Sequence, residues 1–289
     1  MAKAGRVKGE WKRLVVQAAA FLVQNPKLHH FFLGTIDQGD TKIVCAPGLN
    51  CYSCPAAIGA CPIGSLQSAL SAKKPSFPFY VLGFLLLVGL AAGRWICGWL
   101  CPFGWVQDLI YKIPFFKKIR TFRGDRYLRL LKYAVLAVPV ILLPLIDTLV
   151  PYFCKYLCPS GTLFGAIPLT LANGTLRAQI GPLFWWKIGV LLAILLGSLL
   201  IARPFCRYLC PLGAIYGLIN RVSLTHLAYD ESACVHCNKC EPVCPMGIDP
   251  KKQFDSMECI RCGRCARVCP TAALRLRFGI RKTHKNNTI

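Results

Sequence analysis

The sequence predicts a membrane α-helical bundle of about four transmembrane helices, followed by a small C-terminal α+β domain. Long apolar segments, a basic excess that gathers in particular loops, and a cysteine-rich tail carry this prediction. Hydrophobic residues make up 55% of the 289 residues and charged residues only 16%, a balance typical of bilayer proteins. The formal charge of +23 suits cytoplasmic loops, where membrane proteins retain Lys and Arg.

Three segments are apolar enough to cross a hydrocarbon core of about 30 Å. They run from Ser76 to Leu100, from Tyr133 to Cys154 and from Ile188 to Ala202. A fourth segment, from Leu14 to Gly34, is interrupted around Asn25 and Pro26. It either spans the bilayer or lies along its surface as an interfacial helix.

These segments divide the chain into four predicted parts. Residues 1–35 form a basic end and the first membrane helix, 36–75 an extracytoplasmic cysteine-rich loop, 76–220 the transmembrane bundle, and 221–289 the tail domain. The basic N-terminal end, the loop from Lys112 to Arg129 and the tail share one side. The positive-inside rule then predicts a multi-pass protein of the cell (inner, cytoplasmic) membrane with a cytoplasmic tail domain. If the first segment does not span, the termini fall on opposite faces.

The tail carries the most specific motif of the chain. The run Cys-x2-Cys-x2-Cys-x3-Cys-Pro begins at Cys234 and recurs at Cys259, which is the bacterial two-cluster ferredoxin pattern written twice. Three thiolates of such a run hold one [4Fe–4S] cluster, and the fourth ligates the other. One predicted set is Cys234, Cys237, Cys240 and Cys269, and the second is Cys259, Cys262, Cys265 and Cys244. A zinc ribbon, the alternative, needs neither the third cysteine nor the Cys-Pro ending. The tail is therefore expected to be a two-cluster ferredoxin-like domain.

A second phrase, Cys-x3-Cys-Pro-x-Gly, occurs three times, starting at Cys97, Cys154 and Cys206, with a truncated copy at Cys61. Two cysteines four residues apart lie on one helix face, so each pair can supply two ligands. The first and third copies end spans that run inward. We therefore expect an inner membrane cluster held by Cys97, Cys101, Cys206 and Cys210. The alternative is a set of buried free thiols at helix ends.

The outer loops hold six further cysteines, namely Cys45, Cys51, Cys54, Cys61, Cys154 and Cys158. Symmetry with the inner site favours an outer cluster on Cys61, Cys154 and Cys158, with Cys51 or Cys54 as the fourth ligand. A rival set is Cys45, Cys51, Cys54 and Cys61, and disulfides are a third possibility because extracytoplasmic thiols often oxidise. The expected cofactors are thus two [4Fe–4S] clusters in the tail and two more in the membrane part.

With these motifs the chain resembles the membrane polyferredoxin family that includes NapH and the related domains of NosR and CcoG. The resemblance runs from roughly Arg94 to the C-terminus. It implies a helical membrane protein that relays electrons, often from quinol or a cytoplasmic donor to a redox partner. The third Cys-x3-Cys-Pro pair and the set from Cys45 to Cys61 depart from the family's usual two pairs, and suggest clusters at both faces.

Three functions remain open at this point. The first is an electron relay from a cytoplasmic-side partner through the ferredoxin clusters and the intramembrane clusters toward the opposite face. The second is a quinol dehydrogenase subunit of a respiratory reductase chain, with Asp147, His29 and His30 as a candidate quinone or proton site. The third is a redox-sensing or assembly protein. No catalytic residue is assigned; the protein would be an electron-transfer component of an oxidoreductase complex. Expected partners are redox proteins on one or both faces, membrane lipid and, under the second function, quinone, with no nucleic acid.

Overall fold

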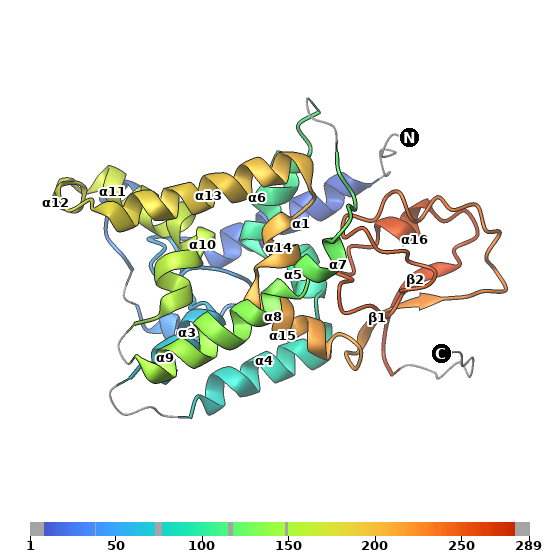
Figure 1. Ribbon diagram of the computed structural model, residues 1–289, viewed down its shortest axis with the longest axis horizontal. Helices are drawn as coiled ribbons and strands as arrows, with labels where there is room; N and C mark the ends of the chain where they lie inside the picture. Colours follow the sequence, from blue (N-terminus) through green and yellow to red (C-terminus); the bar gives the residue numbers. More distant parts are fainter. Residues whose placement is uncertain (1–8, 38, 73–76, 115–117, 148–149, 281–289) are drawn as a thin grey trace.

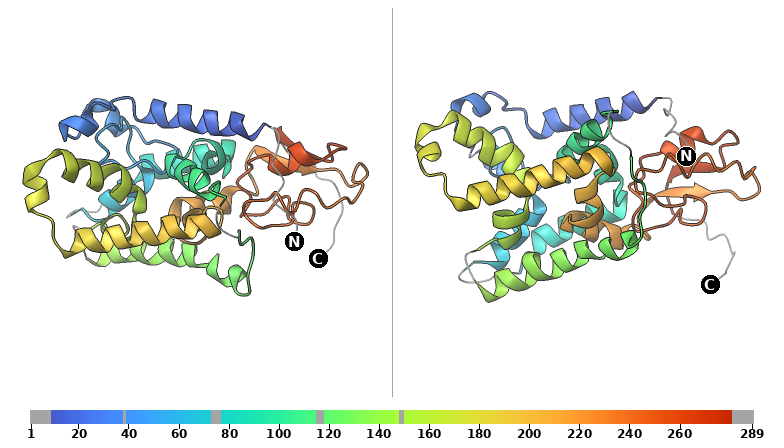
Figure 2. Two further views of the ribbon diagram at one scale, coloured as in Figure 1. Left: turned by 90° about the horizontal axis from the view of Figure 1, so that it is seen from above. Right: turned by 45° about the horizontal axis from the view of Figure 1, so that its top comes forward.

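The computed structural model describes residues 9–37, 39–72, 77–114, 118–147 and 150–280. Four helical segments run along the long axis of the molecule, and the cysteine-rich tail lies at one end of them (Figure 1). They are α1 (Glu10–Gln24), α4 (Phe79–Ala92), the run from α7 to α9 (Asp125–Ile146) and α13 (Pro182–Leu200). The two views of Figure 2 show the same arrangement. The helical part thus has an end that meets the tail and an opposite, far end.

Shorter helices connect these segments. Between the first two long segments lie α2 (His30–Leu33), η1 (Asp40–Ile43) and α3 (Pro62–Leu70). After α4 come α5 (Trp95–Trp99) and α6 (Pro102–Tyr111), and the third segment consists of α7 (Asp125–Leu128), α8 (Leu131–Val135), η2 (Leu136–Leu142) and α9 (Leu143–Ile146). Then follow η3 (Phe153–Leu157), α10 (Pro159–Gly161), η4 (Thr162–Ala166), α11 (Ile167–Ala172) and α12 (Gly174–Ala178). After α13 the helical part closes with α14 (Pro204–Tyr208) and α15 (Pro211–Ile219). Helices α5 and α14 lie toward the tail, whereas α3 and α10 to α12 lie toward the far end (Figure 1).

Two of the described helices are long and apolar enough to cross a membrane. The run Asp125–Ile146 has 22 residues and α13 has 19. Helix α4 has only 14 residues, about 21 Å at 1.5 Å per residue, and ends at Gly93, whose φ of +55° breaks the helix. The predicted span from Ser76 to Leu100 is therefore two helices, α4 and α5, within its described part. A bundle of four transmembrane helices stays a prediction.

The predicted first span is wrong as a single helix. Helix α1 ends at Gln24 and only the single turn α2 follows, because Pro26 disfavours helical geometry in Asn25 before it. The inward side of α1 is also polar, since Arg13 and Gln17 are fully buried against the bundle. Both side chains donate hydrogen bonds to the carbonyl oxygen of Gly98. Helix α1 is thus fixed by polar contacts as well as by apolar packing.

The tail folds around one small sheet. Strand β1 (Thr225–Tyr229) pairs antiparallel with β2 (Leu274–Phe278), with Leu227 opposite Leu276. The two cysteine runs lie between the strands, mostly in loops; Cys265 lies in α16 (Arg264–Val268), the tail's helix in the described residues. This α+β tail packs into the same apolar core as the helical part, because Ile260 and Met246 join Phe103 in one buried cluster.

Candidate metal centres

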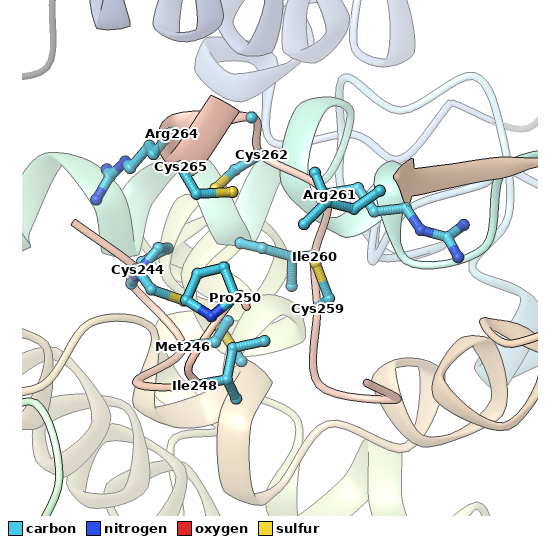
Figure 3. A pocket seen from close by; sticks show the side chains of 13 residues that line it. Cys244, Met246, Ile248, Pro250, Cys259, Ile260, Arg261, Cys262, Arg264 and Cys265 are labelled. Carbon is cyan, nitrogen blue, oxygen red and sulfur yellow. The ribbon is translucent and has the colours of Figure 1, made fainter. Parts of the chain in front are cut away.

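One pocket of the tail brings four cysteines together. Cys244, Cys259, Cys262 and Cys265 line a cavity of about 390 Å³. Figure 3 shows their sulfur atoms around a shared space that Ile248 and other apolar side chains enclose. Cys244 comes from the first cysteine run and the other three from the second.

The second pocket is its counterpart. Cys234, Cys237, Cys240 and Cys269 line a cavity of about 340 Å³, and here the fourth cysteine comes from the second run. Cys237 is exposed, whereas each cysteine of the first pocket is buried or half-buried. Each pocket thus draws three thiols from one run and one from the other. Their role as ligands stays a prediction.

The two cysteine runs share the same backbone conformation. In each, the residue before the second cysteine has a positive φ, 50° at both His236 and Arg261. The residue after that cysteine is again left-handed, at Asn238 and at Gly263. Left-handed geometry costs a branched or bulky residue about 1–2 kcal/mol, whereas Asn and Gly adopt it easily. Two such residues curl the loop tightly, which turns three thiols of each run toward one pocket.

The inner quartet gathers at the tail end of the bundle. Cys97 and Cys206 lie within α5 and α14, and Cys101 and Cys210 precede α6 and α15. All four side chains are buried. Burial raises the pKa of the Cys210 thiol, and its neighbours Cys206, Cys97 and Cys101 raise that pKa further. The structure therefore brings these four thiols together.

Donor groups point at the inner sulfur atoms. The backbone N–H of Gly213 donates to Cys210 Sγ at 3.3 Å, and Gln107 Nε2 donates to Cys206 Sγ at 3.2 Å. Cys210 is the N-cap of α15, and Pro211 fixes the first helical turn, so the free N–H groups of the helix face the thiol. Such bonds to ligand sulfur orient it and favour its charged form.

The outer quartet gathers from three separate segments. A Cβ at Gly161 would lie 3.4 Å from Cys51 Sγ and 3.8 Å from Cys158 Sγ, and a Cβ at Gly64 would lie 3.9 Å from both Cys154 Sγ and Cys61 Cβ. Gly161 N–H donates to Cys158 Sγ at 3.4 Å, the same contact as at the inner site. The structure therefore places Cys51, and not Cys54, with the other three thiols.

Two outer cysteines face elsewhere. The fully buried Cys54 thiol donates to Asn25 Oδ1 at 3.4 Å, and the Cys45 thiol lies 3.9 Å from Ser65 Oγ. These contacts favour the set with Cys154 and Cys158 over the rival set of Cys45, Cys51, Cys54 and Cys61, and the choice of ligands stays a prediction. All eighteen cysteines are free thiols in the structure.

Two fully buried arginines flank the inner quartet, and the sequence reasoning missed them. Arg203 contacts Asp108 through Nε at 3.0 Å and Nη2 at 2.5 Å, and also donates to the carbonyl of Cys97. Arg94 donates to the carbonyl of Cys206 at 3.1 Å and pairs with Glu258 of the tail at 3.0 Å. The sequence does carry a signal for these arginines, because each of them stands three residues before the first cysteine of its Cys-x3-Cys-Pro-x-Gly phrase.

The candidate quinone residues do not come together. Asp147 is exposed and accepts a hydrogen bond from the Tyr152 hydroxyl. The rings of His29 and His30 lie 4.4 Å apart, and His30 contacts Thr35. No contact in the described residues joins Asp147 to either histidine. The prediction that these three residues share one site gains no support.

The four quartets suit a multi-atom cluster better than a single ion. Among the described residues, no three His, Cys, Asp or Glu side chains are close enough to share one metal ion. Each tail quartet instead surrounds a pocket, and each membrane quartet has buried thiols that receive N–H donors. An all-thiolate donor set of four is the usual ligand set of a [4Fe–4S] cluster. The residues present therefore fit that group.

Comparison with known families agrees. A family described as a 4Fe-4S binding domain matches residues 74–123, 133–167 and 183–227, and each segment contains one copy of the Cys-x3-Cys-Pro phrase. Two further families with the same description match residues 226–248 and 252–275, one for each cysteine run of the tail. The protein thus has multiple 4Fe–4S binding domains and binds several [4Fe–4S] clusters.

Curated relatives give the family. The methylamine utilization ferredoxin-type protein MauN of Methylobacillus flagellatus is 33% identical over 172 residues, 57% of this chain and 52% of MauN. The ferredoxin-type protein NapH of Escherichia coli is 25% identical over 188 residues, 64% of this chain and 59% of NapH. An uncharacterized protein of Methanocaldococcus jannaschii is 31% identical over 177 residues, 59% of this chain and 66% of that protein. The matched part of the chain thus spans between half and two thirds of these relatives. No solved structure matches.

The fold and the sites define a protein with several 4Fe–4S binding domains. The chain belongs to the family of ferredoxin-type proteins with 4Fe–4S domains that includes NapH, NosR and MauN.

Proposed function

We propose that the protein relays electrons between a redox partner on the cytoplasmic side and the opposite face of the cell membrane. The observation that carries this proposal is the serial order of the four quartets. The tail, which holds both cysteine pockets, lies at one end; α5 and α14, which carry Cys97 and Cys206, lie near it; and α3 and α10, which follow Cys61 and Cys158, lie further along the helical part (Figure 1). A protein that only docked a soluble partner would have no use for two further thiol quartets within its helical part.

The chain's own residues would hold and shield the clusters. A bound [4Fe–4S] cluster supplies one-electron oxidation and reduction. The sixteen quartet thiols anchor the groups, and the glycine N–H donors at Cys158 and Cys210 stabilise charge on the sulfur atoms. Burial of the membrane quartets keeps water out, which lowers the local dielectric and strengthens these bonds.

The outer surface of the helices supports a membrane location. Leu87 on α4, Ile146 on α9, and Trp185 and Leu196 on α13 expose more than half of their side chains. Large apolar patches of this kind are rare on soluble monomers. The basic loop before α7 lies at the tail end, where Arg120 contacts the tail at Glu241. We therefore propose that the tail end faces the cytoplasm.

Reporter fusions test this orientation. A fusion after Arg126 should report a cytoplasmic position, and a fusion in the loop before α13, after Ala178, should report the opposite side. The reversed pattern would refute the proposed topology. A fusion before α1 decides separately whether this helix crosses the membrane.

Paired cysteine variants test the relay itself. Cys206→Ser with Cys210→Ser removes half of the inner quartet, and Cys154→Ser with Cys158→Ser removes half of the outer one. Each variant should lose about four of about sixteen irons per chain and should stop electron transfer across sealed vesicles. Full iron content and an unchanged transfer rate in either variant would refute the relay through that site. If a variant loses electron transfer from quinol but keeps transfer from a protein donor, that result would favour quinol oxidation over the proposed relay.

A further inference from the structure

One loop of the tail lies directly on the helix that carries Cys97. A Cβ atom at Gly98 would lie 2.3 Å from the carbonyl oxygen of Ile260, a distance that real Cβ atoms do not show. Only glycine permits this approach of the two backbones. Ile260 is 1% exposed and belongs to the same buried cluster as Cys97 and Cys206.

Polar contacts hold this loop in place. Trp99 Nε1 donates to the carbonyl oxygen of Arg261 at 3.1 Å. The Arg94 guanidinium donates to the carbonyl of Met257 at 2.8 Å and pairs with Glu258, while its other nitrogen donates to Cys206 at the inner quartet. One fully buried side chain thus contacts both the inner quartet and the residues just before Cys259.

The two tail pockets differ in how closely they contact the helical part. Two cysteines of the Cys244 pocket, Cys259 and Cys262, flank Ile260 and Arg261 in the docked loop. The first run contacts the helical part through Arg120, which donates to the carbonyl of Glu241 from the loop before α7. Around the Cys234 pocket, Val235 is 60% exposed and Cys237 is also exposed. One pocket thus faces the bundle, and the other faces solvent.

We infer that Gly98 and Trp99 are positioning residues that hold the Cys244 pocket against the inner quartet, so that this pocket, and not the Cys234 pocket, exchanges electrons with the membrane part. The inference rests on the proposed relay. One electron leaves one site and enters the other, and no bond or proton is exchanged. The Cys234 pocket is then the exchange point for a soluble redox protein.

Gly98→Ala in the full-length, cluster-loaded protein tests the inference. The added methyl must push the loop of Ile260 away from α5. The magnetic interaction between the reduced inner cluster and the nearer tail cluster, measured by electron paramagnetic resonance, should weaken or vanish while iron content stays at the wild-type level. Gly83→Ala on α4 is the matched control, because a Cβ there meets nothing within 4 Å.

A milder substitution keeps the inference testable if the Gly98→Ala protein fails to fold. Trp99→Phe removes the hydrogen bond to Arg261 but keeps an aromatic ring in the stack with Trp95, whose centroid lies 5.7 Å away. It should slow reduction of the inner cluster after rapid reduction of the tail and leave each cluster's own spectrum unchanged. If both variants keep the magnetic interaction and the rate of the wild type, the inference is wrong. The relay itself would still stand if the Cys206→Ser, Cys210→Ser variant stops transfer, and would fall if that variant transfers normally.

Discussion

The hydroxyl of Tyr216 donates a hydrogen bond of 3.0 Å to the carbonyl oxygen of Pro47. Tyr216 is a fully buried residue of α15, the helix that follows Cys210, whereas Pro47 lies in the loop after Cys45. A Cβ at the next residue, Gly48, would lie 3.2 Å from the Cα of Cys101. The loop that leads to the outer quartet therefore reaches the inner quartet.

Tyr216 also lies between the two membrane quartets. Burial raises the pKa of its phenol, and the thiols of Cys97, Cys61 and Cys101 raise that pKa further. These thiols belong to the inner set and to the outer set. A single aromatic side chain thus lies near thiols of both sites, in the same buried cluster.

Replacing Tyr216 by Leu should slow electron passage between the inner and outer clusters, because the aromatic ring between them is lost. Tyr216→Phe keeps the ring and should retain most of the rate. Loss of the hydroxyl leaves the Pro47 carbonyl unpaired, which should cost about 1–3 kcal/mol of stability. Stopped-flow reduction of each cluster together with chemical unfolding separates the two effects. Equal rates in the Leu and Phe variants would exclude a role for the ring.

Cys51 and Cys54 provide a matched pair of substitutions for the outer site. Cys51→Ser should remove about four irons per chain, because its thiol lies with Cys61, Cys154 and Cys158. Cys54→Ser should keep all iron, since that thiol is bonded to Asn25. Iron and acid-labile sulfide analysis measures both. The opposite pattern would assign the fourth outer ligand to Cys54.

Cys269→Ala should damage the cluster held by Cys234, Cys237 and Cys240, although Cys269 stands in the second run. The pocket composition is the reason, because Cys269 lines the Cys234 pocket. Mössbauer or electron paramagnetic resonance spectra that resolve the two tail clusters provide the measurement. Selective loss of the cluster on Cys259 to Cys265 would contradict the cross-ligation.

Asp108→Asn should destabilise the protein by about 3–5 kcal/mol, because Arg203 and Arg13 would then be buried without their shared counter-charge. Burial raises the pKa of Asp108, but Arg203 and Arg13 outweigh this and hold the pKa well below its ordinary value. A carboxyl group with a lowered pKa stabilises the fold above its unfolded pKa of about 4, and loses this contribution as the pH falls below that value.

Guanidinium unfolding at several pH values measures both effects of Asp108. The wild-type protein should lose stability as the pH falls below about 4. The stability of the Asn variant should depend less on pH in that range. Asp37→Asn is a suitable control, because Asp37 pairs with the half-exposed Lys27 at 2.8 Å. Similar losses in the Asp37 and Asp108 variants would argue against a special role of the buried network.

Cysteine spacing predicted much of the candidate sites. The C-x2-C-x2-C-x3-C-P runs predicted which thiols line each tail pocket, since three close cysteines can curl around one space while the fourth must point away. Spacing could not decide between Cys51 and Cys54, because both lie in one irregular loop. Their difference depends on the distant Asn25, which binds one thiol and removes it from the set.

Hydropathy predicted the fold less completely. An apolar average predicted spans from Tyr133 to Cys154 and from Ile188 to Ala202. The structure has long helices there, but with other bounds, Asp125–Ile146 and Pro182–Leu200. Such an average does not reveal the residues that end a helix, such as Gly93 with its positive φ or Pro26 after α1. It also treats Arg94 as an interruption, although this side chain is fully buried by its carbonyl and carboxylate partners.

The docked loop of the tail affects how easily oxygen reaches the cluster sites. Ile260 and Met246, each 1% exposed, belong to the same buried cluster as the inner thiols. Cys237, in contrast, is open to solvent. We therefore expect oxidants in solution to reach the Cys234 pocket before they reach the inner quartet. The pocket best placed to meet a soluble partner is thus also the one that is most accessible to oxygen.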